Sequence, residues 1–335
     1  MTRLIKKAVF AVLLTFVFFS CQKIVGVSVS NITLDKESLT LLVGDSKKMT
    51  VIVYPANATN KSVVWSSTDM NVVSIDATGT LSAKALGTAI ITAMTVDGSK
   101  NVSCSVRVGK KNVLYGLGDT LWYERSNNVN YEWYIDQVNT GQYAYVNCGP
   151  ASVTMVIKWS NQNFSKTTED ARKTYRSEGG WWYTSDIVNY LKNNNTAHYI
   201  SDVSSLQSQL DQGSIAILCL DMYYVRQHLG DSEWRIDKFY VTQSPEWGHF
   251  IVVKGYKKVD GKIWYEIYDP WSLNVKYMDG SLKGRNRYYR SEDIMQATNV
   301  WWPYTIVING PKSVTVRTKS IDPSTIVHQW GGKKY

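Results

Sequence analysis

A chain of 335 residues is longer than one ordinary domain and can bury a core in each of two, so two domains are predicted. Aromatic residues make up 13% of the chain and charged residues only 19%, which excludes an intrinsically disordered protein. The net charge of +9 comes from 37 Lys and Arg against 28 Asp and Glu, and no long basic tract carries it, so no nucleic-acid partner is expected.

Residues 1–21 have the pattern of a secretory signal peptide. Basic residues at the start precede an apolar run over 8–19 that is short for a membrane span. Ser20-Cys21 resembles a bacterial lipoprotein cleavage site, which implies a lipidated Cys21 that contacts the membrane. Gln22 implies, by the same resemblance, the outer membrane or cell surface. The alternatives are a secreted protein without lipid and an uncleaved anchor.

The segment 27–108 consists of short alternating strands separated by turn residues, which predicts a β-sandwich. Strands are expected over 32–34, 39–41, 49–53, 63–65, 72–75, 80–83, 89–93 and 102–108. Five motifs occur in order along this segment, namely Val43-Gly44-Asp45, Tyr54-Pro55, Val64-Trp65-Ser66-Ser67, Asp76-Ala-Thr-Gly79 and Gly87-Thr88-Ala-Ile-Ile-Thr92. They resemble those of the bacterial immunoglobulin-like domains of group 2, and the resemblance implies a surface spacer or, alternatively, an adhesion module.

The remaining chain is predicted to contain a linker over 109–130, a second domain over 131–312 and a tail over 313–335. Gly and Asn residues in 109–130 break any regular pattern. In the second domain helices are expected first, from Cys148 and over 167–177, 184–191 and 204–212, with a later one over 291–297. Strands are expected over 214–220, 248–255, 262–268 and 304–308. This order predicts an α+β domain in which a helical layer packs on an antiparallel sheet.

Cys148 comes immediately before Gly149-Pro150 and an apolar run of helical spacing, so its thiol is predicted to lie at a helix N-terminus. The helix dipole and unpaired N–H groups favour a thiolate there. The alternative is a buried structural cysteine. If Cys21 carries lipid, Cys104, Cys148 and Cys219 form an odd set, so at least one thiol is free. No cysteine or histidine cluster has metal-ligand spacing, and no structural zinc is predicted.

His249 and Asp269 lie on two predicted strands joined by Asp260-Gly261, a strong hairpin signal. With these two residues at the centre of the turn, position 269 lies opposite position 252. His249 is then about three residues away, near the same end of the hairpin. A longer loop or a β-bulge would bring Asp269 within reach of the imidazole.

Together these residues suit acyl transfer to a thiol, with Cys148 as nucleophile, His249 as base and Asp269 as the group that orients the imidazole. A donor for the developing oxyanion is also needed. Gln142 lies six residues before Cys148, as in papain-like enzymes, and Gln137 lies eleven before it, in Tyr134-Ile-Asp-Gln137. Gln137 is favoured, Gln142 is the alternative, and either could be an ordinary polar loop residue.

The second domain resembles the double-glycine (bacteriocin-leader) peptidase-like family of papain-like cysteine peptidases. The matching motifs are Cys148-Gly-Pro-Ala-Ser, Gly248-His249-Phe-Ile-Val-Val-Lys-Gly255 and Asp269-Pro270-Trp271. The resemblance implies a papain-like fold, no cofactor, and cleavage of a peptide or related amide through an acyl-thioester. Members that mature bacteriocins are fused to a membrane transporter, which is not found here, so cleavage after a double glycine is not expected.

These features indicate an exported, lipid-anchored cysteine peptidase that acts on a peptide or protein substrate and is held away from the membrane by its immunoglobulin-like domain. The alternatives are a non-catalytic surface protein that uses a papain-like scaffold for binding or adhesion, and a cell-wall peptide hydrolase. Trp181-Trp182 and Trp301-Trp302 could line a substrate groove or pack in the core.

Overall fold

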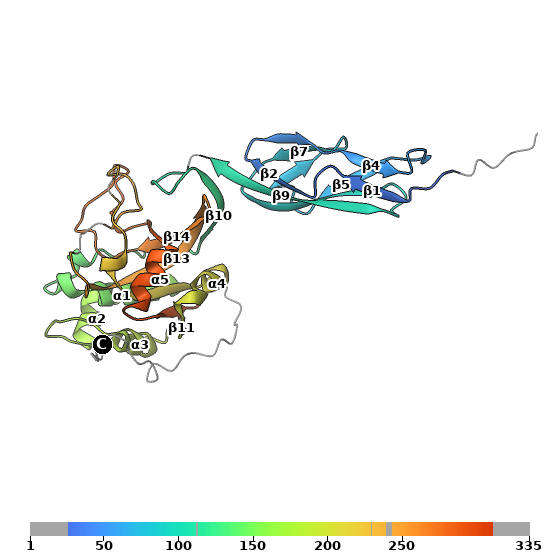
Figure 1. Ribbon diagram of the computed structural model, residues 1–335. Coiled ribbons are helices and arrows are strands. Elements are labelled where there is room, and N and C mark those ends of the chain that lie inside the picture. Colours follow the sequence, from blue (N-terminus) through green and yellow to red (C-terminus); the bar gives the residue numbers. More distant parts are fainter. Residues whose placement is uncertain (1–25, 112, 229, 239–242, 311–335) are drawn as a thin grey trace, which may run out of the picture.

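The computed structural model describes residues 26–111, 113–228, 230–238 and 243–310. The predicted signal peptide with Cys21 and the predicted tail over 313–335 lie outside these ranges. The described chain forms an all-β unit that extends from an α+β unit, and the long strand β9 leads from the first to the second (Figure 1). Within the described ranges, no helix is both long and apolar enough to cross a bilayer.

The first unit is a β-sandwich, as predicted. Strand β1 pairs with β4, β2 runs parallel to β9, β9 pairs with β8 and β8 with β5, while β7 pairs with β3 and β6. Leu81, Ile91 and Val106 are fully buried between the sheets. The strand bounds are β1 Asn31–Leu34, β2 Ser38–Leu42, β3 Ser46–Lys48, β4 Val51–Tyr54, β5 Val63–Ser67, β6 Val73–Ile75, β7 Thr80–Ala83, β8 Gly87–Thr95 and β9 Asn101–Lys111.

The strand expected over 49–53 forms as β4, which begins two residues later than predicted. Strand β3, which precedes it and belongs to a different sheet, was not predicted. Met49 lies between them with a buried side chain, and its N–H donates to Gly79 O at 2.9 Å. The hydrophobic run that begins at Met49 therefore includes the point at which the chain passes from one sheet to the other.

The connection over 109–130 is not irregular throughout, as the sequence had suggested, because it contains strand β10 (Thr120–Ser126). β10 pairs with the end of β9 and, through most of its length, with β13 (Gly248–Val259) of the second unit. The Trp122 ring lies against Gly109, and Arg107 stacks over that ring at 4.7 Å. The two units are thus joined by a continuous set of strand pairs.

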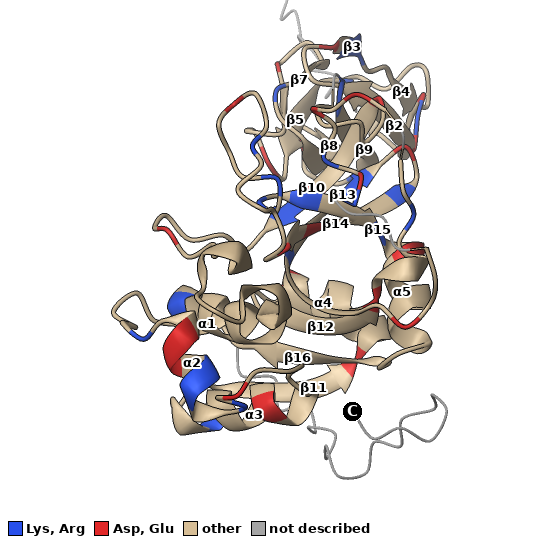
Figure 2. Cartoon of the chain, turned by 90° about the vertical axis from the view of Figure 1, so that its left-hand side faces the viewer, with Lys and Arg blue, Asp and Glu red and all other residues tan. Residues whose placement is uncertain are grey.

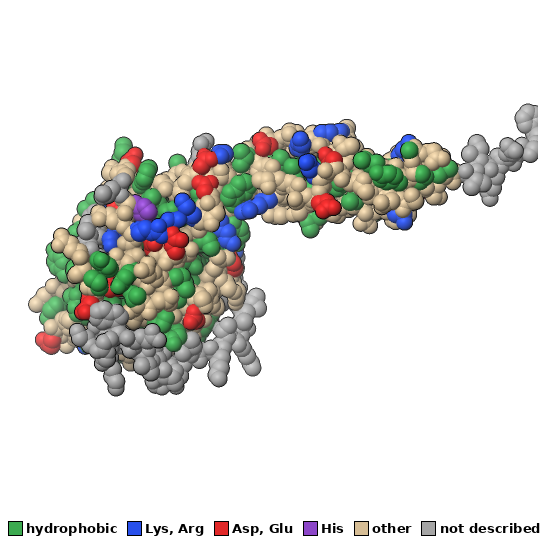
Figure 3. Space-filling model, viewed as in Figure 1, with side chains coloured by type: hydrophobic (Ala, Val, Ile, Leu, Met, Phe, Trp, Pro, Cys, Tyr) green, Lys and Arg blue, Asp and Glu red, His purple; other side chains and the backbone are tan. Residues whose placement is uncertain are grey.

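Basic residues gather where β9, β10 and β13 meet (Figure 2). Two of them form ion pairs, Lys111 with Asp119 and Lys257 with Glu124. On the face shown in Figure 3, acidic and basic side chains are interspersed. The distribution agrees with the expectation that the net charge is spread over the surface.

The second unit is built on an antiparallel sheet of order β11-β16-β12-β13-β10, with β14 beside β13 and β15 beside β14. The predicted central strand is confirmed, since every residue of β12 is buried. β11 and β15 were not predicted. The bounds are β11 His198–Asp202, β12 Ile215–Asp221, β14 Lys262–Tyr268, β15 Arg287–Arg290 and β16 Tyr304–Ile308.

Helices cover both faces of this sheet, whereas the sequence predicted one helical layer. The odd-numbered residues from Ile215 to Cys219 pack with α1 and α3, and the even-numbered ones from Ala216 to Leu220 pack with α4 and α5. This arrangement explains why β12 is apolar without alternation. The helices are α1 Cys148–Ser160, α2 Thr168–Thr174, α3 Thr184–Asn193, α4 Leu206–Asp211 and α5 Ser291–Asn299; the 3-10 turns are η1 Gln137–Asn139, η2 Ala144–Val146, η3 Val203–Ser205 and η4 Met222–Tyr224.

Candidate active site

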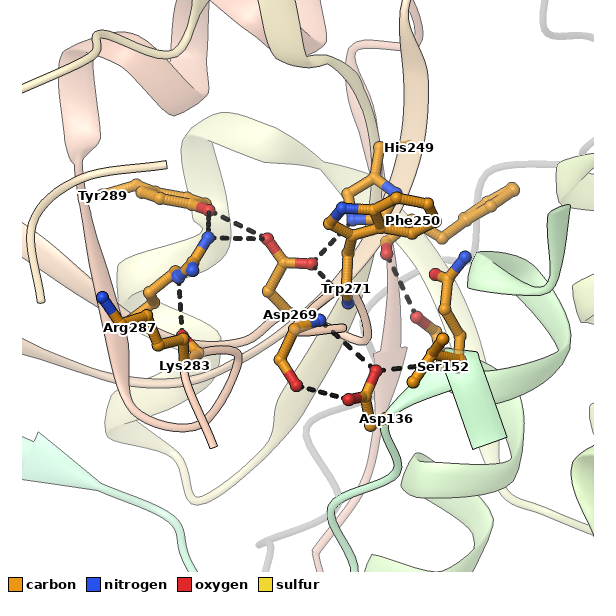
Figure 4. A network of polar contacts seen from close by, with 12 residues as sticks. Asp136, Ser152, His249, Phe250, Asp269, Trp271, Lys283, Arg287 and Tyr289 are labelled. Atoms are coloured by element: carbon orange, nitrogen blue, oxygen red, sulfur yellow. Dashed lines mark hydrogen bonds and ion pairs between the residues drawn. The ribbon is translucent and has the colours of Figure 1, made fainter. Parts of the chain in front are cut away.

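Helix α1 begins at Cys148, as predicted, and is buried along most of its length. Cys148 itself is 3% exposed. One turn further on, Ser152 Oγ donates to Phe250 O at 3.2 Å, which fixes α1 against β13 at the residue next to His249 (Figure 4). The central helix therefore holds its first residue beside the start of β13.

The β13–β14 hairpin turns at Asp260-Gly261, as predicted, with positive φ at both residues. The register shifts between Val253 and Gly255, so β13 carries an extra residue and Tyr268 lies opposite Val252. The ladder thus directs Asp269 one residue closer to His249 than an unbulged hairpin would. The His249 Nε2 and Asp269 Oδ1 atoms are 2.8 Å apart.

Asp269 is fully buried and held from several sides (Figure 4). Its Oδ1 also accepts from Trp271 N at 3.0 Å, and its Oδ2 accepts from the Tyr289 hydroxyl at 2.9 Å and lies 3.6 Å from Arg287 Nη1. Burial alone would raise the pKa of Asp269, but the charge and hydrogen bond of His249 and the charge of Arg287 outweigh it and lower the pKa. Asp269 is therefore a carboxylate at neutral pH.

His249 lies between this carboxylate and the Cys148 thiol. Burial disfavours the imidazolium, but the charge and hydrogen bond of Asp269 and a hydrogen bond with Cys148 outweigh it and raise the pKa of His249 to about 10. Because Nε2 faces Asp269, Nδ1 is the ring nitrogen available to the thiol. The structure therefore brings Cys148, His249 and Asp269 together in the order that the sequence suggested.

The two candidate glutamines differ in their surroundings. Gln137 is buried, its Nε2 donates to Ala144 O at 2.9 Å, and its backbone N–H donates to Pro270 O at 2.7 Å. It thus connects the turn before Cys148 with the residue after Asp269. Gln142 lies on an exposed turn.

Arg172 on α2 is buried beside the turn that leads into α1. Its Nε donates to Asn147 Oδ1 at 2.8 Å, its Nη2 to Val146 O at 2.9 Å and its Nη1 to Gly180 O at 2.9 Å. Burial lowers the pKa of Arg172, and negative charge at Cys148 acts in the opposite direction. A guanidinium at this position therefore holds the turn before Cys148 and places a positive charge near its thiol.

Replacing Arg172 by glutamine is expected to slow alkylation of Cys148 by iodoacetamide at neutral pH about tenfold, because a buried positive charge near the thiolate is lost. Arg172→Lys should recover part of the rate but not the full set of hydrogen bonds. The measurement is the rate of adduct formation on Cys148, followed by mass spectrometry, with circular dichroism to confirm folding. Exposed Lys173, the next residue on α2, provides the control Lys173→Gln. A folded Arg172→Gln protein that is alkylated at the wild-type rate would contradict the electrostatic role.

A cavity of about 650 Å³ opens beside Cys148. Its walls include five tryptophans, namely Trp181, Trp182, Trp247, Trp301 and Trp302. Both tryptophan pairs singled out in the sequence therefore line this space, and the side chains of Trp182 and Trp302 are also buried. Cys219 is buried and lines the same cavity.

All three cysteines within the described residues, Cys104, Cys148 and Cys219, are free thiols. In the same part of the chain, no group of three or more His, Cys, Asp or Glu residues is arranged to hold a metal ion. Cys21, the predicted lipidation site, lies outside the described ranges.

Several residues that shape the site were not found from the sequence. Arg287 and Tyr289 lie on the short strand β15, whose sequence Arg-Tyr-Tyr-Arg has no apolar alternation that would indicate burial, yet both are buried behind Asp269. Asp136 is buried and accepts from Asn274 N at 2.8 Å and from Ser272, so it fixes the loop after Asp269. Its position next to Gln137, a candidate site residue, was the sequence signal that could have identified Asp136.

Two family models match the chain in succession. Residues 28–106 match the bacterial Ig-like domain of group 2, and residues 128–298, a little over half of the chain, match the Peptidase_C39-like family. The chain therefore belongs to the Peptidase_C39-like family and carries a bacterial Ig-like domain before the peptidase-like domain. The predicted order of an immunoglobulin-like β domain and an α+β peptidase-like domain is confirmed.

Curated relatives share shorter stretches with this chain. An Ig-like virion protein of Serratia phage KSP90 is 41% identical over 83 residues, which cover 24% of this chain and 32% of that protein. An uncharacterised protein of Clostridium acetobutylicum is 37% identical over 116 residues, which cover 31% of this chain and 12% of that protein. The chain thus spans at most 32% of the length of these two relatives.

Two solved structures match parts of this chain. A putative C39-like peptidase from Bacillus anthracis has 12% identity and a TM-score of 0.37, with 57% of this chain and 100% of that chain covered. Domains 1–6 of the surface layer protein SbsC have 20% identity and a TM-score of 0.22, with 25% of this chain and 13% of that chain covered.

Proposed function

We propose that this protein is an exported cysteine peptidase that hydrolyses peptide or related amide bonds through an acyl-thioester on Cys148. The observation that supports this most strongly is the position of His249, hydrogen-bonded to both the Cys148 thiol and the Asp269 carboxylate. All three side chains are buried, and a cavity that can hold a substrate segment adjoins the thiol. Nucleophilic catalysis by cysteine requires this combination of nucleophile, base and orienting group.

In the first half of the reaction, the Cys148 thiolate attacks the carbonyl carbon of the substrate and the carbonyl oxygen takes up the negative charge. His249, held as imidazolium by Asp269, gives its proton to the amide nitrogen as the carbon–nitrogen bond breaks. The amine leaves and the acyl group remains on sulfur. In the second half, neutral His249 takes a proton from water as the water attacks the thioester, and the carboxylic acid leaves with regeneration of the thiolate and imidazolium.

The oxyanion needs donors that are already in place. We assign this role to the side-chain amide of Gln137, together with the backbone N–H of Cys148 at the start of α1. Gln137 is held between the turn before Cys148 and Pro270, whereas Gln142 is exposed on its turn. The assignment rests on this fixed and buried position.

The location of the enzyme is part of the same proposal. A lipid on Cys21 would anchor the mature chain in the outer membrane, facing the cell surface, and the Ig-like domain would hold the peptidase-like domain away from the lipid. The paired strands β9, β10 and β13 favour a spacer role for the Ig-like domain, because they join the two units without a long flexible linker.

The decisive experiment is labelling of the purified protein with a peptidyl thiol-directed inhibitor, followed by peptide mapping. A single adduct on Cys148 is expected, with no adduct in Cys148→Ala. Cys219→Ala is the matched control, because Cys219 lines the same cavity and its loss should leave labelling intact. Labelling that persists in Cys148→Ala would overturn the assignment of the nucleophile.

The same preparations distinguish the alternatives. An active peptidase should cleave an unstructured protein such as casein, whereas a cell-wall peptide hydrolase should instead release peptides from purified peptidoglycan. A folded wild-type protein that shows neither cleavage nor inhibitor labelling would favour the non-catalytic surface protein.

A further inference from the structure

The cavity beside Cys148 has aromatic walls that begin at the reacting groups themselves. Gly149 follows Cys148, and a Cβ atom there would lie 2.9 Å from the Trp182 side chain. Gly248 precedes His249, and a Cβ atom there would lie 2.4 Å from the Trp301 ring. Because Gly149 and Gly248 have no side chains, Trp182 can pack directly against α1 beside Cys148, and Trp301 can pack directly against β13 beside His249.

The polar groups of the cavity are mostly engaged with the protein. Arg176 donates from Nε to Asp186 at 2.8 Å and stacks over the Tyr183 ring at 4.0 Å. Cys219 is hydrogen-bonded to Trp301, and burial raises its pKa, so it is a neutral thiol. Glu246 is exposed at the rim. The interior thus offers aromatic surface and no buried, uncompensated charge to an occupant.

A space of about 650 Å³ with such walls fits a large apolar side chain and leaves glycine residues without contacts. Aromatic rings and branched aliphatic chains gain from contact with tryptophan faces, and a peptide that carries them would expel water from the cavity. A charged side chain would lose its hydration there without a partner.

From these contacts we infer that the substrates are peptides with an aromatic or large aliphatic residue next to the scissile bond, and that a double-glycine site is a poor substrate. This inference rests on the proposed peptidase function and names the substrate class of the same site. It assigns specificity to the tryptophan walls.

The test is digestion of a proteome-derived peptide library, with the cleaved positions read by mass spectrometry on both sides of each bond. Aromatic and large aliphatic residues are expected to be enriched about tenfold at one position beside the cleaved bond, and Gly-Gly to be depleted. Cleavage mainly at Gly-Gly, or with no preference, would overturn the inference while leaving the peptidase function intact.

Trp181 allows a sharper test, because it is 53% exposed and forms part of one wall rather than the core. Trp181→Ala is expected to lower the ratio of kcat/KM for a Phe-containing peptide to kcat/KM for its Gly-Gly counterpart about tenfold. Trp234→Ala is the matched control, since Trp234 is 42% exposed in the same unit and does not line the cavity. An unchanged ratio in Trp181→Ala would contradict the assignment of specificity to this wall.

Binding can be measured without turnover, which separates this inference from the peptidase proposal. In Cys148→Ala, tryptophan fluorescence should change on titration with the Phe-containing peptide at concentrations at least tenfold below those needed for the Gly-Gly peptide. Equal affinities would overturn the inference even if no catalysis were found. Preferential binding of the Phe-containing peptide without cleavage by the wild type would support the inference and remove the peptidase function.

Discussion

Replacement of His249 by alanine is expected to lower kcat/KM for peptide hydrolysis about 10⁴-fold. The variant lacks both the group that stabilises the thiolate and the acid that protonates the leaving amine. The buried Asp269 carboxylate also loses its hydrogen-bonded partner. The residues of such a catalytic unit act together, so Cys148→Ala should cost about as much as His249→Ala, and the double variant little more.

The pH dependence of the wild type provides a second measurement of the same group. Because the pKa of His249 is raised to about 10, the imidazolium persists through neutral pH, and kcat/KM should fall only as the pH rises through about 10. Protonation of His249 also contributes to the free energy of unfolding, because its pKa is higher in the folded state than in the unfolded state. This contribution is complete below the unfolded-state pKa of about 6.5 and is lost as the pH rises from there towards 10.

The predicted loss of stability with rising pH can be checked with His249→Gln, which removes the titrating group. The difference in unfolding free energy between wild type and His249→Gln should decrease from pH 6.5 to pH 10. His198→Ala, on the distant strand β11, is a control for loss of a half-buried histidine and should retain activity. A basic limb of kcat/KM near pH 7 would contradict the charged His249–Asp269 pair.

Arg287→Leu is expected to destabilise the peptidase-like domain by about 3 kcal/mol, because the buried Asp269 carboxylate loses one of its two cationic partners and keeps only His249. Arg287 is 1% exposed, donates from Nε to Lys283 O at 2.7 Å and lies 3.6 Å from Asp269. Burial opposes its charge, but Tyr289 and Asp269 outweigh this and raise the pKa of Arg287. The guanidinium is therefore charged at neutral pH.

Urea unfolding followed by tryptophan fluorescence is suited to this measurement. Trp65 is the only one of the 13 tryptophans that precedes β10, so the signal reports mainly on the peptidase-like domain. Arg290→Leu, at the other end of β15, is the matched control. Its partner Glu292 is exposed, so a change of only about 0–1 kcal/mol is expected. Equal small losses for both variants would contradict the role of Arg287 as the counter-charge of Asp269.

Most of the elements around the site could be predicted from short stretches of the sequence. The start of α1 at Cys148, the strand β12 and the turn at Asp260-Gly261 all depend on neighbouring residues. Caps, turns and hydrophobic periodicity act over a few residues, so they can be recognised without knowledge of distant contacts. The ordered motifs around Cys148, His249 and Asp269 gave a resemblance to double-glycine peptidase-like enzymes, of which the match to the Peptidase_C39-like family is shown.

How the site residues come together depends on contacts that only the three-dimensional structure shows. The extra residue at Lys254 moves Asp269 towards His249, and Lys254 itself forms a buried ion pair with Glu266 at 2.7 Å. Arg287 and Arg172 appear in the sequence as ordinary charged residues, yet each is buried beside one member of the site. Their roles come from contacts between segments far apart in the chain, and such contacts leave no local periodicity or turn signal.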